Sequence, residues 1–145
     1  MKKIVSLFLL VASVCGLIGC GKDSVSDVKI DYGDSSVYSE EEMDEAIEVI
    51  KDEFSTGQWR GFELQNVSYS SDDKCDLDNN GWLRELAEAN NLSDDFTQCI
   101  MFESDFHTPE NVSAEWNPDT DYTDFQWWLV RTDHNEWKLL SWGYC

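Results

Sequence analysis

Two residues near the end of a predicted strand are of the types that move protons in enzymes. Asp105 and His107 are separated by one residue, and side chains two positions apart point to the same face of a strand. A carboxylate beside an imidazole can act as a general base, so the pair predicts an enzyme active site as one alternative. The other interpretation is that His107, which leaves the strand for a proline-containing loop, contacts solvent or anchors that loop.

A second motif, D-L-D-N-N-G, begins at Asp76 and matches the first half of an EF-hand calcium loop. Its candidate oxygen ligands are Asp76, Asp78 and Asn80. The second half does not match, because Arg84 occupies position nine and Ala87 stands where a bidentate glutamate is needed. The motif therefore predicts either a calcium-stabilised domain or a polar turn that caps the following helix. The sequence indicates no other cofactor.

Three cysteines, Cys75, Cys99 and Cys145, follow Cys20. Outside the cell such residues can oxidise, and we predict a disulfide between Cys75 and Cys99. This bridge would tie the loop before the second predicted helix to the next strand, and in the chain-entropy model it would contribute roughly 3–4 kcal/mol. Pairing of Cys145 with either partner stays open, since an odd cysteine always remains.

Aromatic residues in the C-terminal half exceed what one core face of a sheet requires. In the predicted strand over 124–132, alternation places Trp127 on one face and Trp128 on the other. One of these faces could line a groove or present tryptophan to a sugar or a partner protein, unless both faces are covered. Trp116 lies in a loop, where a core role is hard to assign. The candidate ligand-binding residues are His107, Trp116, Trp127, Trp128 and Arg131.

The composition excludes several classes of partner. The formal net charge is −20 and no Lys/Arg stripe occurs, which argues against nucleic-acid binding. The same acidity argues against electrostatic attachment to anionic lipid. The sequence also lacks a phosphate-binding loop and the H-E-x-x-H and G-x-S-x-G motifs. No common catalytic signature therefore favours an enzyme.

The elements that must position these residues follow from hydrophobic periodicity. Ser39 and Glu42 form a capping box, and apolar residues at helical spacing predict a helix that ends near Gly57. A second, short helix is predicted between strands, over 82–89. Four strands are predicted, over 62–70, 99–106, 124–132 and 137–144. This order indicates an α+β domain in which the N-terminal helix packs on a curved antiparallel sheet of about four strands.

The N-terminus carries the features of an export signal. Lys2 and Lys3 precede an apolar run over 4–14, which is too short to cross a membrane as a helix. The L-I-G-C that ends at Cys20 resembles the lipobox of bacterial lipoproteins, in which the cysteine is lipidated and becomes the first mature residue. Acyl chains such as palmitate would then anchor the protein on the extracytoplasmic face of the cell membrane. We expect a signal peptide over 1–19, a lipidated cysteine and flexible tether over 20–37, and a single α+β domain over 38–145.

Four segments carry a resemblance to known proteins: 104–107, 116–118, 122–131 and 137–144. With motifs such as S-D-F-H, W-N-P and W-K-L-L-S-W-G-Y, the chain resembles a family of uncharacterised lipoproteins from Gram-positive bacteria. The last motif is also similar to the final strand of the NTF2-like (cystatin-like) superfamily. Over residues 38–144 this resemblance implies a cone, in which a helix lies in the concavity of a curved antiparallel sheet. Because that superfamily contains both enzymes and binding modules, the resemblance implies no activity.

These observations favour a non-catalytic, membrane-tethered binding module with its site on the concave face or rim of the sheet. Its partner would be an envelope protein or a small ligand that the sequence does not identify. The alternatives are an NTF2-like enzyme that uses Asp105 and His107, and a calcium-stabilised domain that uses the loop beginning at Asp76.

Overall fold

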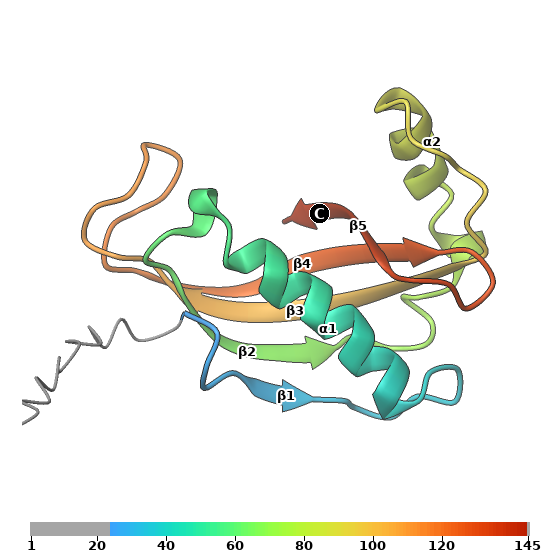
Figure 1. Cartoon of the computed structure of the whole chain (residues 1–145), viewed down its shortest axis with the longest axis horizontal. Coiled ribbons are helices and arrows are strands. Elements are labelled where there is room, and N and C mark those ends of the chain that lie inside the picture. The colour runs from blue at the N-terminus through green and yellow to red at the C-terminus, as the bar shows by residue number, and fades with distance from the viewer. Residues whose placement is uncertain (1–23, 145) are drawn as a thin grey trace, which may run out of the picture.

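The computed structural model describes residues 24–144, which form one five-stranded sheet together with α-helices and 3₁₀ helices (Figure 1). The strands lie side by side in chain order, with β1 parallel to β2 and the other neighbours antiparallel, and the sheet stays open. The predicted α+β class is confirmed. The elements are β1 (Lys29–Asp31), α1 (Glu40–Phe54), η1 (Gly57–Trp59), β2 (Glu63–Tyr69), η2 (Leu77–Asn79), α2 (Trp82–Ala89), β3 (Gln98–His107), β4 (Asp121–Arg131) and β5 (Lys138–Gly143).

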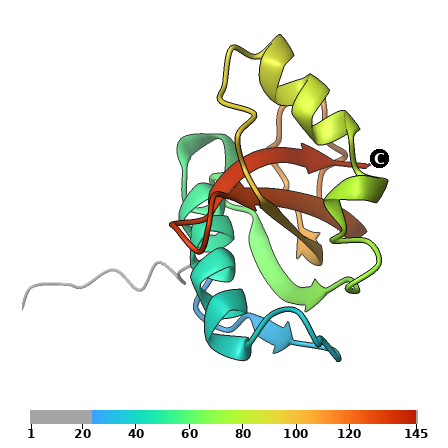
Figure 2. The same cartoon turned by 90° about the vertical axis from the view of Figure 1, so that its right-hand side faces the viewer.

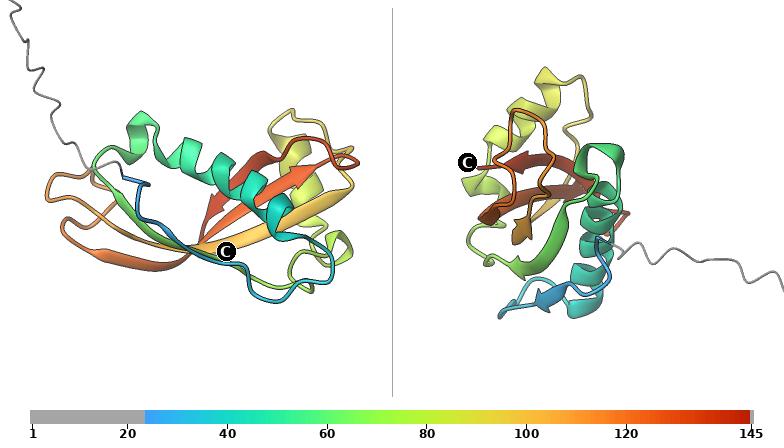
Figure 3. Two further views of the ribbon diagram at one scale, coloured as in Figure 1. Left: turned by 60° about the horizontal axis from the view of Figure 1, so that its bottom comes forward. Right: turned by 90° about the vertical axis from the view of Figure 1, so that its left-hand side faces the viewer.

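The helix α1 forms where it is predicted, because its cap and its apolar face agree. The Ser39 hydroxyl accepts a hydrogen bond from the Glu42 N–H at 3.2 Å, and the Glu42 carboxylate accepts one from the Ser39 N–H at 3.0 Å. The apolar face then packs on the sheet, which curls around the helix (Figure 3). The buried side chains of α1 are Met43, Ala46, Ile47, Ile50 and Phe54.

The two faces of the sheet are covered by different helices. In Figure 2, α1 and α2 lie on opposite sides of the strands. On β4, Trp127 packs against Phe54 of α1 with ring centroids 6.3 Å apart, and Trp128 packs against Trp82 of α2 at 5.2 Å. Both faces of the sheet are therefore covered at these two tryptophans, which agrees with the interpretation that neither face is left open to a ligand.

The segment before α1 differs from the predicted flexible tether over 20–37. β1 lies within it and adds a parallel strand to the edge formed by β2. Further along, the Asp72 carboxylate accepts hydrogen bonds from the hydroxyls of Ser35 at 2.5 Å and Ser36 at 2.8 Å, and these bonds, that from Ser35 first, lower the pKa of Asp72. The expectation of a tether is wrong for residues 24–37, because a three-residue strand shows no periodicity and its partners lie far along the chain.

The four predicted strands correspond to β2 through β5, and the two predicted helices to α1 and α2. β4 begins at Asp121, earlier than predicted, because its first residues pair with the end of β3 beyond an irregularity in register. Within residues 24–144, no helix has the length and apolar character needed to cross a bilayer. The predicted signal peptide and the lipidation site Cys20 lie outside the described residues.

Candidate functional site

A cavity lined by aromatic side chains opens beside the C-terminal end of α1. Three parts of the chain line it: the stretch 57–62, the loop 111–116 between β3 and β4, and Trp142 of β5. Figure 1 shows how η1 and this loop lie at the same end of the molecule. The volume is about 520 Å³, which lies within the range of small-molecule sites. This cavity, the aromatic hollow, is the candidate functional site.

The floor of the aromatic hollow is continuous with the core. Trp59 is 2% exposed, and its ring centroid lies 5.0 Å from that of Phe54 and 5.4 Å from that of Trp127. On one wall, Trp116 lies 5.8 Å from Trp59. On the rim, Trp142 is 41% exposed and stacks on Trp127 at 6.5 Å. Each such aromatic pair contributes about 0.5–1.5 kcal/mol beyond its area burial, so contacts with the core hold these rings in place. Trp142 nevertheless remains accessible to solvent.

The turn between η1 and β2 places Trp59 at this position. α1 ends at Phe54, and Gly61 then turns the chain with a φ of +84°, a conformation that glycine adopts without a steric penalty. A Cβ added to Gly61 would lie 3.2 Å from Cγ of Pro109, so the backbone approaches the β3–β4 loop closely. Phe62 follows and packs edge-to-face on Trp59 at 5.5 Å. The two walls of the hollow therefore meet at Gly61 and Pro109.

One polar atom in the aromatic hollow lacks a partner. In the described part of the chain, the indole N–H of Trp59 is the buried side-chain polar group for which no hydrogen bond is found. Buried polar groups nearly always find a partner, and an unpaired one costs about 1–3 kcal/mol. An indole N–H can only donate, so the matching group must be an acceptor. This N–H is also shielded from solvent, so it is an unpaired polar group within the floor of the hollow.

Arg131, a predicted ligand-binding residue, lies at the other end of α1 in a closed cluster. Its side chain is 1% exposed, and Nη2 lies 2.5 Å from Oε1 of Glu42 while Nε donates to Oε1 of Gln98 at 2.7 Å. The guanidinium carbon lies 4.2 Å from the ring centroid of Trp137. The bond to Arg131, followed by that to the Ser39 N–H, lowers the pKa of Glu42 from 4.5 to about 2.

The closed cluster, which consists of Glu42, Gln98, Arg131 and Trp137, corrects the expectation that Arg131 faces a ligand. Its cation is paired with a carboxylate, hydrogen-bonded to an amide and covered by an indole ring. The cluster joins the end of β4 to the first turn of α1. Its observed role is to fix the helix on the sheet.

The three candidate tryptophans have different surroundings. Trp116 lines the aromatic hollow, as a ligand-binding residue should. Trp127 is fully buried beneath it and donates its indole N–H to Oγ of Ser104 at 2.8 Å. Trp128, on the opposite face, is 5% exposed and donates to Oε1 of Gln126 at 3.2 Å. Trp127 and Trp128 are therefore core residues, and Trp116 is the one predicted residue that the structure brings to the hollow.

Asp105 and His107 are engaged with different partners. Asp105 accepts hydrogen bonds from the Asn66 amide at 2.6 Å and from the Asp124 N–H at 3.1 Å. His107 contacts Oδ1 of Asp121 at 2.8 Å through Nδ1 and Oδ1 of Asp119 at 3.1 Å through Nε2. These contacts, the one to Asp121 first, raise the pKa of His107. The imidazole is thus held by carboxylates of the β3–β4 loop and β4, which fits the loop-anchor interpretation.

The loop that matches half of a calcium motif uses its side chains internally. The Asp76 carboxylate accepts the Asp78 N–H at 2.9 Å, which begins η2. The Asn80 amide donates to the carbonyls of Lys74 and Asp76 at 2.7 Å, and its oxygen accepts the Trp82 indole N–H at 3.3 Å. Across residues 24–144, no group of three or more acidic, His or Cys side chains is placed to hold a metal. The calcium site stays a prediction.

The predicted disulfide partners lie together as free, buried thiols. Sγ of Cys99 donates to the carbonyl of Cys75 at 3.1 Å, and the Met101 N–H donates to Sγ of Cys75 at 3.2 Å. Burial raises the pKa of both thiols, that of Cys99 to about 12, so both are protonated at neutral pH. The structure therefore brings Cys75 and Cys99 together but does not contain the predicted bridge. Cys145 lies outside the described residues.

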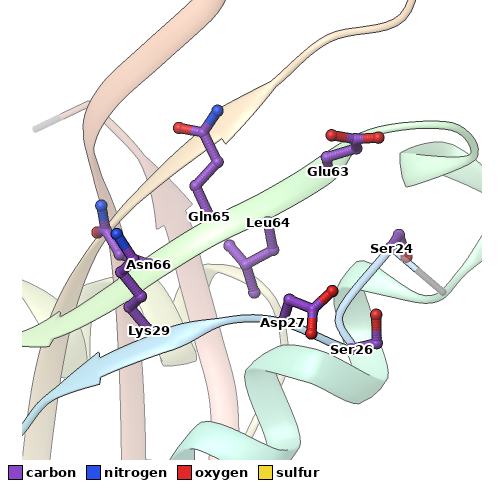
Figure 4. A pocket seen from close by; sticks show the side chains of 8 residues that line it. All are labelled: Ser24, Ser26, Asp27, Lys29, Glu63, Leu64, Gln65 and Asn66. Carbon is purple, nitrogen blue, oxygen red and sulfur yellow. The ribbon is translucent and has the colours of Figure 1, made fainter. Parts of the chain in front are cut away.

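A second hollow lies where the first described residues meet β2 (Figure 4). Its volume is about 370 Å³. The side chains that line it diverge: Glu63 and Gln65 project to one side of the strand, whereas Leu64 points to the other. A ligand site needs polar groups that converge on one point. This hollow is therefore a weaker candidate than the aromatic one.

Sequence reasoning did not single out Trp59 or Trp142 as site residues. Trp59 follows the end of a helix and has no periodic pattern around it. Trp142 alternates correctly for the core face of β5, and its exposure arises because that strand is an edge of the sheet. The sequence does contain an indication for Trp59. A large aromatic residue between Gly57 and Gly61 has few local side chains to pack on, so it must be buried against a distant part of the chain.

The comparisons with known proteins return no match: no protein-family model, no curated protein and no solved structure is similar to the chain. The function therefore has to be argued from the site. A fold class alone would not decide it in any case, since one fold supports many functions.

Proposed function

We propose that this protein is an extracytoplasmic, lipid-anchored binding module whose ligand site is the aromatic hollow. The observation that carries the proposal is an accessible tryptophan, Trp142, beside a cavity of about 520 Å³ that is also lined by Trp116. A hollow that served packing alone would have little reason to keep a tryptophan accessible at its rim. We further propose the NTF2-like arrangement, which the position of α1 in the concavity of the sheet supports.

The proposed anchor is a lipid on Cys20, as the resemblance of L-I-G-C to a lipobox implies. The carbonyl of Ser24 accepts a hydrogen bond from the Leu64 N–H at 3.0 Å, which ties Ser24 to β2. Ser24 lies four positions after Cys20, and even a fully extended chain of this length spans at most ~14 Å. The domain would therefore sit close to the membrane surface instead of extending away from it on a long tether.

This short span between Cys20 and Ser24 places the aromatic hollow at the anchored end of the domain. Ser24 and Trp59 line one shared depression of about 360 Å³, and Trp59 also lines the aromatic hollow. A ligand would be captured within a short distance of the lipid. We therefore expect the ligand to be a component of the envelope layer next to the membrane.

The anchor is tested with the full precursor expressed in a bacterium and labelled with an alkyne-bearing fatty acid. Wild type should carry the label and partition into detergent, and the Cys20→Ala variant should do neither. A label that persists on the Cys20→Ala variant would contradict the anchor. A matched Cys75→Ala variant should label normally, because its thiol is buried.

The binding site is tested by co-sedimentation of the mature chain, made lipid-free by Cys20→Ser, with purified envelope material from the host. Wild type should sediment, whereas Trp142→Ala should remain in solution. Leu92→Ala removes an apolar side chain of similar exposure, 52%, outside the hollow and should sediment like wild type. Equal sedimentation of the Trp142 and Leu92 variants would refute the aromatic hollow as the site.

A further inference from the structure

We propose, building on the proposed function, that the ligand of the aromatic hollow is a neutral sugar ring of a glycan. A pyranose ring has a flat face of C–H groups and an edge of hydroxyls. The flat face requires an accessible aromatic ring, and Trp142 provides one, with Trp116 on the adjoining wall. Stacking on Trp127 from beneath fixes the orientation of the Trp142 ring before a ligand arrives.

The polar groups around the hollow match hydroxyls better than they match a purely apolar ligand. A hydroxyl both donates and accepts hydrogen bonds. Among the residues that line the hollow, the amide of Asn111 offers both functions and the Glu115 carboxylate offers an acceptor, whereas the Gln58 amide nitrogen already donates to Glu53.

Charge decides between neutral and anionic glycans. The chain carries a formal net charge of −20, and Arg60 is the cation among the residues that line the hollow. A polyanion would be repelled over the whole approach to such a surface. A neutral ring meets no such barrier, and its hydroxyls need no counter-charge.

A proline-rich peptide is the other ligand that aromatic-lined grooves accept, since it offers carbonyl acceptors and flat rings. It presents no side-chain donor, however, so the exposed carboxylate of Glu115 would gain no hydrogen bond from it, whereas a sugar hydroxyl can donate one. The sugar ring is therefore the better match, and the peptide serves as a competing arm of the test.

The test is an isothermal titration of the mature chain carrying Cys20→Ser against a panel of probes. The panel holds neutral trisaccharides of glucose, mannose, galactose and N-acetylglucosamine, an oligoglucuronate of equal length, and a nonaproline peptide. At least one neutral trisaccharide should bind, and the oligoglucuronate should not. Trp142→Ala should weaken binding at least ~10-fold, and Asn111→Ala, which removes an amide that lines the hollow, should weaken it about 5-fold. Leu92→Ala should leave it unchanged.

The outcomes separate this inference from the proposed function. If no neutral trisaccharide binds, or if the peptide or the oligoglucuronate binds instead, the sugar assignment is overturned. If sedimentation with envelope material still depends on Trp142 in that case, the hollow remains a binding site for another class of ligand. If sedimentation does not depend on Trp142 either, both proposals fail.

Discussion

Aromatic side chains lie at both ends of α1, but the buried polar groups are paired at one end, whereas one of them is unpaired at the other. At the N-terminal end, the closed cluster pairs the Arg131 cation with Glu42 and Gln98 and covers it with Trp137. At the C-terminal end, within the described structure, the aromatic hollow leaves the Trp59 N–H unpaired and Trp142 accessible. The polar groups of the closed cluster are paired within the chain, whereas the aromatic hollow contains one unpaired donor among the described residues and an accessible ring.

This difference shows how one part of a concave sheet face can stabilise the fold while another part stays accessible for binding. A buried charge is tolerated only where it is paired, and removing its partner is strongly destabilising. The closed cluster therefore adds to the apolar packing that holds α1 on the sheet. The hollow is less complete, because within residues 24–144 it leaves one neutral donor unpaired and the edge strand β5 exposes the Trp142 ring to solvent.

The largest expected effect is at the closed cluster. Arg131→Ala should lower the free energy of unfolding by about 3 kcal/mol, since it removes the charged hydrogen bonds to Glu42 and Gln98 and uncovers the Trp137 ring. Urea denaturation followed by circular dichroism measures this change. Arg60→Ala, at an exposed arginine, is the matched control and should change stability by less than about 0.5 kcal/mol. Equal losses of unfolding free energy in the two variants would show that Arg131 contributes no more to stability than an exposed arginine does.

A smaller effect should appear in acid. The folded-state pKa of Glu42 is depressed from 4.5 to about 2, so its contribution to stability is present above pH 4.5 and is lost as the pH falls toward 2. Glu42→Gln keeps the capping box but removes the charge. It should therefore be less stable than wild type by about 2 kcal/mol at pH 7, and the gap should close between pH 4.5 and 2. A gap that stays constant over this range would show that the Glu42 charge is not what holds the cluster.

The smallest effect on stability is expected at the aromatic hollow. Trp142→Ala removes a side chain that is 41% exposed on an edge strand, so the free energy of unfolding should fall by only about 1 kcal/mol. Thermal melting of wild type and variant measures it, alongside the loss of binding proposed above. A loss as large as that of Arg131→Ala would mean that the hollow is part of the core, and the contrast between the two ends of α1 would disappear.

Several elements could be predicted from the sequence because their causes are local. The capping box of Ser39 and Glu42 begins α1, and apolar spacing of three and four residues defines its buried face. The strands of the C-terminal half alternate over enough residues to be recognised, and α2 matches its predicted range. Trp116 could also be singled out, because a tryptophan beside N-P in a polar loop has few local uses.

The sequence by itself thus determined the α+β class and the identity of most elements, whereas tertiary structure decided what the elements do together. The bond between Arg131 and Glu42 joins residues 89 positions apart, and it turned a predicted ligand residue into part of the closed cluster. β1 acquires its strand conformation only by pairing with β2. Trp59 and Trp142 meet in one hollow because the sheet brings an edge strand beside the end of α1. Periodicity and capping act within a few residues, but burial and charge pairing depend on which distant segments the fold places in contact.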